Sequence, residues 1–147
     1  MRRSDTVTVH KMLRALQFHQ GDEIRMSPSQ IGRFCMGGQK RASVWLATAG
    51  GKPVAFALAR DWMNFVRGFM VRHIDLLFVA EDFRTKGIGS SLIEHVTRDA
   101  FRTGCGRVDI GAAKNNRIAR NCYEKLGFKP RANYAVQYQL ARKLGRR

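Results

Sequence analysis

The chain has 147 residues, of which 44% are hydrophobic and 26% are charged. This length suffices for one domain with its own core, and the composition is ordinary for a globular protein. No uninterrupted apolar run approaches the length that spans a bilayer, and no long apolar segment follows the first residues. We therefore expect a single domain over residues 1–147, with no membrane segment and no signal peptide.

The chain is strongly basic, with 27 Lys and Arg residues against 11 Asp and Glu residues and a formal net charge of +16. Such an excess favours polyanionic partners, which include phosphorylated ligands, RNA or DNA, and anionic surfaces. The basic residues are dispersed along the chain, however, so a generally basic surface without a specific partner explains the charge equally well. Charge alone therefore does not distinguish a polyanion-binding protein from one with a generally basic surface.

The cysteines and histidines do not form a metal-binding pattern. Cys35, Cys105 and Cys122 are an odd number and lack the spacing of a metal site. An odd set of scattered thiols also argues against a disulfide framework. We expect reduced thiols, a cytoplasmic location and no metal.

Two helices are predicted before the first strand. Val9, Met12, Leu13 and Leu16 have helical spacing, which predicts an amphipathic helix over about 9–19. A second helix begins after Ser27, because Ser27 and Gln30 can form a capping box and Pro28 suits the first helical position. Gly37 and Gly38 end it.

Strands follow. The segments 43–48 and 54–60 flank Gly50-Gly51-Lys52-Pro53, which predicts a β-hairpin. We interpret 61–68 as a connecting loop and 69–79 as a strand. The apolar run at the end of this strand, from Ile74 to Val79, indicates a central position with both faces covered.

Helices and strands alternate in the second half. The spacing predicts a helix over 88–102, a short strand over 107–111, a helix over 116–126 capped by Gly127, and a final strand over 134–140. The whole order predicts an α/β (α+β) fold in which about four helices flank a mixed, mostly antiparallel sheet.

The most informative segment joins the central strand to the helix at 88–102. Two glycines, Gly87 and Gly89, lie where the helix opens, and Arg84 and Lys86 add positive charge. Glycines let the backbone approach an anion closely, and a helix N-terminus presents unpaired N–H groups to it. These residues predict a site for pyrophosphate without specifying which nucleotide carries it.

The motif Arg84-x-x-Gly87-x-Gly89 resembles the acetyl-CoA-binding signature of the GNAT superfamily of N-acetyltransferases. The segment from Asn116 to Phe128 also looks like the family's Asn-x-x-Ala-x-x-x-Tyr-x-Lys-x-Gly-Phe ending. The resemblance covers about 43–141 well and the first forty residues loosely. It implies an enzyme that transfers an acetyl group from acetyl-CoA (coenzyme A) to a primary amine by direct attack in a ternary complex.

The resemblance also implies where the cofactor binds. The pantetheine arm pairs with the preceding strand, and the pyrophosphate is held by backbone amides of the following loop; Asn116 matches an asparagine that commonly contacts the cofactor. The implied cofactor-binding residues are Leu77, Phe78, Val79, Arg84, Thr85, Lys86, Gly87, Ile88, Gly89, Ser90 and Asn116.

Two residues are candidates for proton transfer. Tyr123 matches the tyrosine that the family often places near the thioester sulfur as general acid, whereas a packing role is the alternative. Asp75 interrupts the buried strand and resembles the glutamate of diamine acetyltransferase-like members, which suggests a general base. A salt bridge of Asp75 with Arg72 or Arg60 is the alternative, and His73 is a weaker candidate for the base.

The family's usual first strand has only one candidate, the short segment at 5–9. A curtailed strand there leaves an open sheet edge or a contact for a second subunit, and the family leads us to expect a homodimer. A basic protein suits polyamine acceptors poorly, so a small amine, an amino acid, a protein N-terminus or lysine, and an RNA-linked amine stay open. The rival hypothesis is a nucleic-acid-binding or regulatory protein that keeps this scaffold without turnover.

Overall fold

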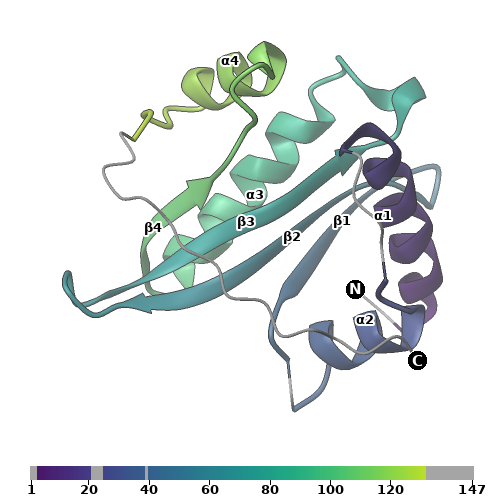
Figure 1. The fold of residues 1–147 in the computed structure, drawn as a ribbon, viewed down its shortest axis with the longest axis horizontal. Helices are drawn as coiled ribbons and strands as arrows, with labels where there is room; N and C mark the ends of the chain where they lie inside the picture. The colour runs from purple at the N-terminus through teal and green to yellow at the C-terminus, as the bar shows by residue number, and fades with distance from the viewer. Residues whose placement is uncertain (1–2, 21–24, 39, 132–147) are drawn as a thin grey trace.

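The computed structural model describes residues 3–20, 25–38 and 40–131 (Figure 1). In chain order the described elements are α1 (Thr6–Gln20), α2 (Pro28–Cys35), β1 (Ser43–Ala49), β2 (Lys52–Asn64), β3 (Phe69–Val79), α3 (Ile88–Arg102), β4 (Cys105–Ile110) and α4 (Arg117–Lys125), with short 3-10 turns at Arg3–Asp5 and Glu81–Phe83. The final strand predicted at 134–140 lies outside the described residues. The remaining order agrees with the prediction.

The described strands form one sheet in the order β1-β2-β3-β4. The first three strands are antiparallel, whereas β4 runs parallel to β3. The two-residue turn between β1 and β2 has positive φ at both Gly50 (55°) and Gly51 (76°), a conformation that favours glycine and matches the twist of a hairpin. The parallel pair needs a crossover, which α3 supplies. The mixed, mostly antiparallel sheet is thereby confirmed.

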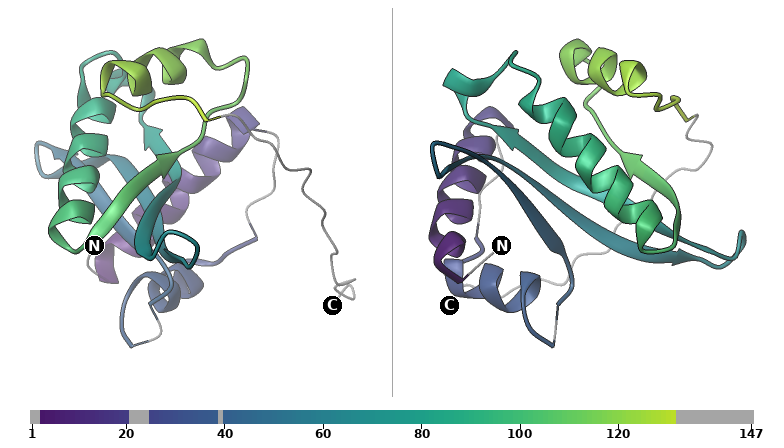
Figure 2. Two further views of the ribbon diagram at one scale, coloured as in Figure 1. Left: turned by 90° about the vertical axis from the view of Figure 1, so that its left-hand side faces the viewer. Right: turned by 180° about the vertical axis from the view of Figure 1, so that it is seen from behind.

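Helices cover both faces of the sheet, with α1 and α2 on one face and α3 and α4 on the other (Figure 2). On the α3 face, Ala55, Ala57 and Ala59 of β2 are buried beneath the helix, whose Ile93 and Val96 are also buried. Small residues on the strand let the helix approach the sheet. The opposite face is filled by larger side chains, which include Val9, Ile31 and the stacked rings of Phe56 and Phe78, 6.1 Å apart.

The signals for the start of α2 are confirmed in detail. The Ser27 side chain accepts a hydrogen bond from the Gln30 amide at 3.3 Å, and the Gln30 side chain accepts one from the Ser27 amide at 2.8 Å. This reciprocal pair is a capping box, with Pro28 at the first helical turn. It fixes where α2 begins, although the helix is only eight residues long.

Two local predictions are wrong. Residues 61–68 are not all loop, because β2 continues to Asn64 and pairs there with Phe69; only the four residues 65–68 turn. The segment at 5–9 is not a strand, because α1 already begins at Thr6. Within the described residues β1 is therefore an edge strand, with no partner on its outer side.

Candidate active site

The central strand β3 pairs with β4 over only the first half of its length. The parallel pairing of β3 with β4 ends at Ile74 opposite Ile110, so the segment from Asp75 to Val79 has no partner on that side among the described strands. The register with β2 also shifts here, because Leu58 lies opposite Leu76 while Ala59 lies opposite Ile74. Asp75 is the extra residue of this bulge, which turns the strand away from β4. Figure 1 shows the two strands diverging beyond this point.

The loop that follows β3 presents a run of backbone donors. The Arg84 amide donates to the Glu81 carbonyl at 3.1 Å, and the Ser91 amide donates to the Gly87 carbonyl at 2.9 Å. Between them, the amides of residues 85–90 donate to no acceptor in the part of the chain that the structure describes. Six successive donors at the positive end of α3 form an environment suited to an anion.

Two backbone conformations expose these donors. Thr85 has φ of 62° and Gly87 has φ of 77°, both in the left-handed region. Alternation of ordinary and left-handed residues turns successive N–H groups toward a common side, as in other anion-binding turns. Glycine adopts this conformation without a steric cost, whereas Thr85 does not. The strain at Thr85 is offset in part by its hydroxyl, which donates to the Arg84 carbonyl at 2.6 Å.

Side chains tie this loop to its surroundings. The Arg84 Nε atom donates to the Val79 carbonyl at 3.0 Å, which anchors the loop on the end of β3. The Lys86 ammonium lies 5.4 Å from the centre of the Phe83 ring. Both cationic side chains are exposed beside the unbonded amides. They add positive charge where the backbone donors gather.

Tyr123 is fixed by the end of α4. The Phe128 amide donates to the Tyr123 carbonyl and the Gly127 amide to the Glu124 carbonyl, each at 3.0 Å, and Gly127 has φ of 87°. This is a Schellman ending, which brings the Tyr123 and Phe128 rings to 6.2 Å. Tyr123 also packs against the core under α3, and this burial raises the pKa of its hydroxyl above the ordinary value.

Asn116 is the N-cap of α4. Its side-chain oxygen accepts a hydrogen bond from the Ala119 amide at 3.1 Å. The side-chain NH₂ group of an asparagine in this role keeps its two donors for another partner. Asn116 therefore begins α4 and also stays exposed as a donor.

Asp75 is held by Arg60 from the neighbouring strand. Arg60 Nε donates to Asp75 Oδ2 at 2.8 Å and Arg60 Nη2 to Oδ1 at 2.6 Å, which is a bidentate pair. His73 Nε2 lies 3.9 Å from Asp75 Oδ1. Of the two arginines expected as partners, Arg72 does not contact Asp75; it pairs instead with Asp61 and Asp99.

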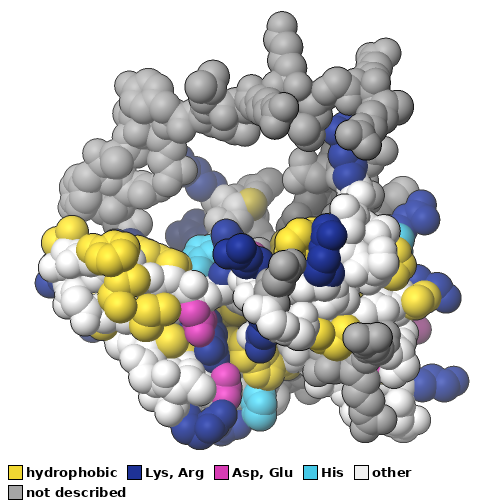
Figure 3. Space-filling model, turned by 90° about the horizontal axis from the view of Figure 1, so that it is seen from below, with side chains coloured by type: hydrophobic (Ala, Val, Ile, Leu, Met, Phe, Trp, Pro, Cys, Tyr) yellow, Lys and Arg dark blue, Asp and Glu magenta, His cyan; other side chains and the backbone are white. Residues whose placement is uncertain are grey.

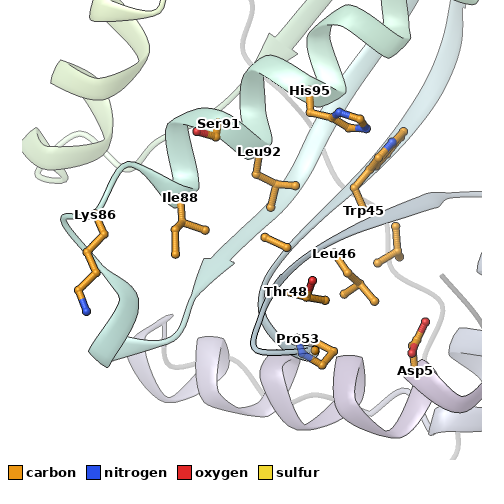
Figure 4. A pocket seen from close by; sticks show the side chains of 13 residues that line it. Asp5, Trp45, Leu46, Thr48, Pro53, Lys86, Ile88, Ser91, Leu92 and His95 are labelled. Atoms are coloured by element: carbon orange, nitrogen blue, oxygen red, sulfur yellow. The ribbon is translucent and has the colours of Figure 1, made fainter.

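The structure contains two hollows, and each is lined in part by a tryptophan, Trp45 in one and Trp62 in the other. A cavity of about 660 Å³ lies between α3 and the edge strand β1, with Lys86 at one end and Trp45 and His95 at the other (Figure 4). A second hollow of about 510 Å³ is lined by Arg41, Arg60, Asp61, Trp62 and His73. It adjoins the Arg60–Asp75 pair. No sequence signal places Arg41 at this hollow, because its position depends on how α2 leads into β1.

Chemically, the site combines a loop with six unbonded amides, an open strand edge, a partly buried phenol and a carboxylate. The residues that the structure describes contain no group of three or more His, Cys, Asp or Glu side chains able to hold a metal ion. Among the described helices, none has both the length and the apolar character of a membrane span. The arrangement places unbonded backbone donors and two cationic side chains beside the open edge of β3.

The sequence profile of the Acetyltransferase (GNAT) family matches residues 10–128. The chain therefore belongs to this family of acetyltransferases. A protein of Methanocaldococcus jannaschii described as an uncharacterized N-acetyltransferase is 35% identical over 79 residues, which are 53% of this chain and 35% of that protein. The chain thus spans about a third of the length of this relative.

Two solved structures share the fold. An aminoglycoside acetyltransferase from an uncultured soil metagenomic sample, in complex with sisomicin, has a TM-score of 0.80 at 15% identity, over 97% of this chain and 93% of that one. An aminoglycoside N-acetyltransferase in complex with CoA has a TM-score of 0.69 at 21% identity, over 96% of this chain and 97% of that one. At these identities the likeness extends to the fold and not to the substrate.

Proposed function

We propose that this protein is an acetyl-CoA-dependent N-acetyltransferase that acts on a primary amine. The observation that supports this most directly is the run of six unbonded amides at residues 85–90, next to the open edge of β3. Family membership supports the same reaction, and one of the similar structures contains CoA. Acetyl-CoA is then a co-substrate that binds and leaves in each turnover.

In this proposal the loop binds the pyrophosphate of acetyl-CoA. The amides of residues 85–90 donate to its oxygens, and Arg84 and Lys86 balance its charge. The pantetheine arm pairs with the backbone of β3 from Leu77 to Val79, as an added strand does at a sheet edge. Asn116 contributes a side-chain donor from the start of α4. The thioester then lies near the bulge at Asp75.

Each proton transfer has a candidate residue. A primary amine with a lysine-like pKa of about 10.4 is mostly protonated near neutral pH, so it loses a proton to Asp75, directly or through water, before attack. The amine nitrogen then forms a bond with the thioester carbonyl carbon, and the carbon–sulfur bond breaks as the intermediate collapses. The departing thiolate takes its proton from the Tyr123 hydroxyl. The second proton of the amine nitrogen then passes through water to the Tyr123 phenolate, and Asp75 releases its proton to solvent. No acyl-enzyme is needed.

The first experiment measures binding and turnover separately. We expect acetyl-CoA to raise the melting temperature of the protein, and we expect CoA release, corrected for hydrolysis, with at least one member of an amine panel. The panel contains small amines, amino acids, peptide N-termini, lysine peptides and an aminoglycoside, with mass spectrometry for the acetylated products. No thermal shift and no acetylated product from any amine would contradict the proposal.

A second candidate function is nucleic-acid binding on the same scaffold. The end of the β2–β3 hairpin exposes Trp62, Met63, Phe65 and Val66, with Phe65 89% and Val66 93% exposed. Hydrophobic side chains gather on one face of the molecule that also carries many Lys and Arg side chains (Figure 3). Exposed aromatic rings beside cationic groups suit stacking on single-stranded bases. Salt-dependent RNA binding that Tyr123→Phe leaves unchanged would favour this second function.

A further inference from the structure

The hollow beside Asp75 has a defined position relative to the proposed reaction. His73 lies on β3, two residues before Asp75, and Arg60 lies opposite on β2. Asp75 is itself two residues from Leu77, where the proposed path of the pantetheine arm begins. A group in this hollow therefore lies beside the segment of β3 at which the thioester is expected.

The acidic side chains at this hollow are already paired. Both oxygens of Asp61 accept from Arg72 at 2.7 Å, and both oxygens of Asp75 accept from Arg60. Because each of these carboxylates already balances one guanidinium, the hollow has no surplus negative charge for several additional cations. The hollow does not have the lining that a polycationic ligand needs.

Arg41 is the remaining arginine at this hollow, since Arg60 is paired with Asp75. It lines the hollow, and within the described residues no carboxylate lies within ion-pair distance of its guanidinium. Its backbone is held in place, because the amides of Arg41 and Ala42 both donate to the Phe34 carbonyl at the end of α2, at 2.7 and 3.1 Å. The hollow therefore contains an exposed guanidinium on an anchored backbone, with no ion-pair partner among the described residues, beside the half-exposed ring of Trp62.

We infer that the acceptor is a small amine that carries a carboxylate or phosphate group, and that Arg41 binds this anionic group. The inference rests on the proposed acetyltransferase function and names its substrate class. A guanidinium forms charge-assisted, often bidentate hydrogen bonds with such groups. Trp62 supplies an apolar wall, and the amine of the acceptor points toward Asp75. Aminoglycosides, which carry several ammonium groups, are excluded as good acceptors because Arg41 repels them.

The test uses acceptors in matched pairs. O-phosphoethanolamine is compared with ethanolamine, glycine with glycinamide, and sisomicin is added as a polycation. We expect kcat/KM for the member that carries the phosphate or carboxylate, in at least one pair, to exceed that of the member without it by about tenfold or more, the size of one charge-assisted hydrogen bond.

Variants locate the effect at Arg41. Arg41→Gln is expected to lower kcat/KM for the acceptor with the acid group about tenfold, while kcat/KM for the acceptor without it and the KM for acetyl-CoA stay unchanged. Arg41→Lys keeps the charge and is expected to retain most of the preference. Arg98→Gln on the exposed face of α3 removes an equal charge away from the hollow and serves as the control.

The outcomes separate this inference from the proposed function. Turnover that prefers sisomicin or amines without an acid group, with no effect of Arg41→Gln, would overturn the inference of an acid-bearing acceptor and leave the proposed acetyltransferase function intact. Equal loss of activity in Arg41→Gln toward acceptors with and without the acid group would also overturn it, because an anion-binding role predicts selectivity. Absence of both acetyl-CoA binding and turnover contradicts the proposed function itself.

Discussion

The Ser90 hydroxyl in the first turn of α3 lies 3.3 Å from the Cys122 sulfur in α4. Ser90 carries the last of the unbonded amides of the anion-binding loop, and Cys122 precedes Tyr123. The contact therefore joins the loop proposed to hold the pyrophosphate to the helix that carries the proposed general acid. It couples the position of the phenol to the position of the loop.

Replacing Tyr123 by Phe removes the hydroxyl and keeps the ring that packs against Phe128. We expect kcat to fall about a hundredfold or more, because a positioned general acid contributes about 10²- to 10⁴-fold. The affinity for acetyl-CoA, measured by calorimetry, should not change. A variant that keeps the kcat of the parent protein would show that Tyr123 only packs.

The pH dependence of kcat gives an independent check on Tyr123. Burial raises the pKa of its hydroxyl above the ordinary value of about 10. The phenol therefore remains protonated, and able to donate, up to at least about pH 10. The kcat profile of the parent protein should show no alkaline loss from this group below that pH. An alkaline limb near pH 8 that Tyr123→Phe abolishes would contradict the assignment of the raised pKa.

Gly87→Ala tests the left-handed turn of the anion-binding loop. An added Cβ at Gly87 meets nothing within 4 Å, but φ of 77° is unfavourable for any residue with a side chain. We expect a loss of about 1 kcal/mol in the free energy of unfolding, and a weaker affinity for acetyl-CoA because the amides move. Urea unfolding and calorimetry measure the two effects.

Gly37→Ala is the matched control for that strain. Gly37 has φ of 76°, and its added Cβ also meets nothing within 4 Å, but it follows α2 and lies outside the loop. Its cost in stability should be similar, without a change in the affinity for acetyl-CoA. Equal losses of affinity in both variants would mean that the effect at Gly87 reflects destabilisation alone.

The elements that the sequence predicted correctly have local causes. The capping box at Ser27, the paired glycines at 50 and 51, and the Gly127 ending each determine a boundary through nearby atoms. The errors involve tertiary context. Trp62 and Met63 belong to β2 because they pair with Val71 and Met70 across the hairpin, a pairing that no local signal in 61–68 reveals.

The candidate site also contains both kinds of feature, those with local causes that the sequence predicts and those that depend on tertiary context. The left-handed Gly87 and the start of α3 could be predicted, because glycine spacing and a helix start are local features of 84–90; anion binding by this loop stays a prediction. The divergence of β3 from β4 could not, since it depends on a bulge that places Asp75 out of register with β2. The position of Arg41 beside Arg60 and His73 depends on the packing of three elements, and composition indicated only that the chain is basic.

Asp75→Asn tests the proposed base. The amide has nearly the shape of the carboxylate but does not accept the proton of the amine, so we expect kcat/KM to fall about a hundredfold or more. Asp99→Asn is the control: Asp99 is a similarly buried, ion-paired carboxylate that lies on α3 away from the hollow. It should lower stability and leave kcat unchanged. Equal kinetic losses in both variants would assign Asp75 a structural role.

Arg72 is the buried centre of an ion-pair network, only 4% exposed, and it contacts Asp61 of β2, Asp99 of α3 and the ring of Trp45. Arg72→Met leaves these carboxylates without their shared cation. We expect the free energy of unfolding, measured in urea, to fall by about 3 kcal/mol, as when one partner of a buried pair is removed.

Arg102→Met is the control, because Arg102 pairs with the same Asp99 but is largely exposed, and its loss should cost less than about 1 kcal/mol. Hydrogen bonds from Arg102 and Arg72 lower the pKa of Asp99. Stability from Asp99 is thus fully present above about pH 4, its unfolded pKa, and declines as the pH falls through the lower folded value. Both variants should weaken this acid dependence. Equal losses of stability at neutral pH would contradict the difference in burial on which this prediction depends.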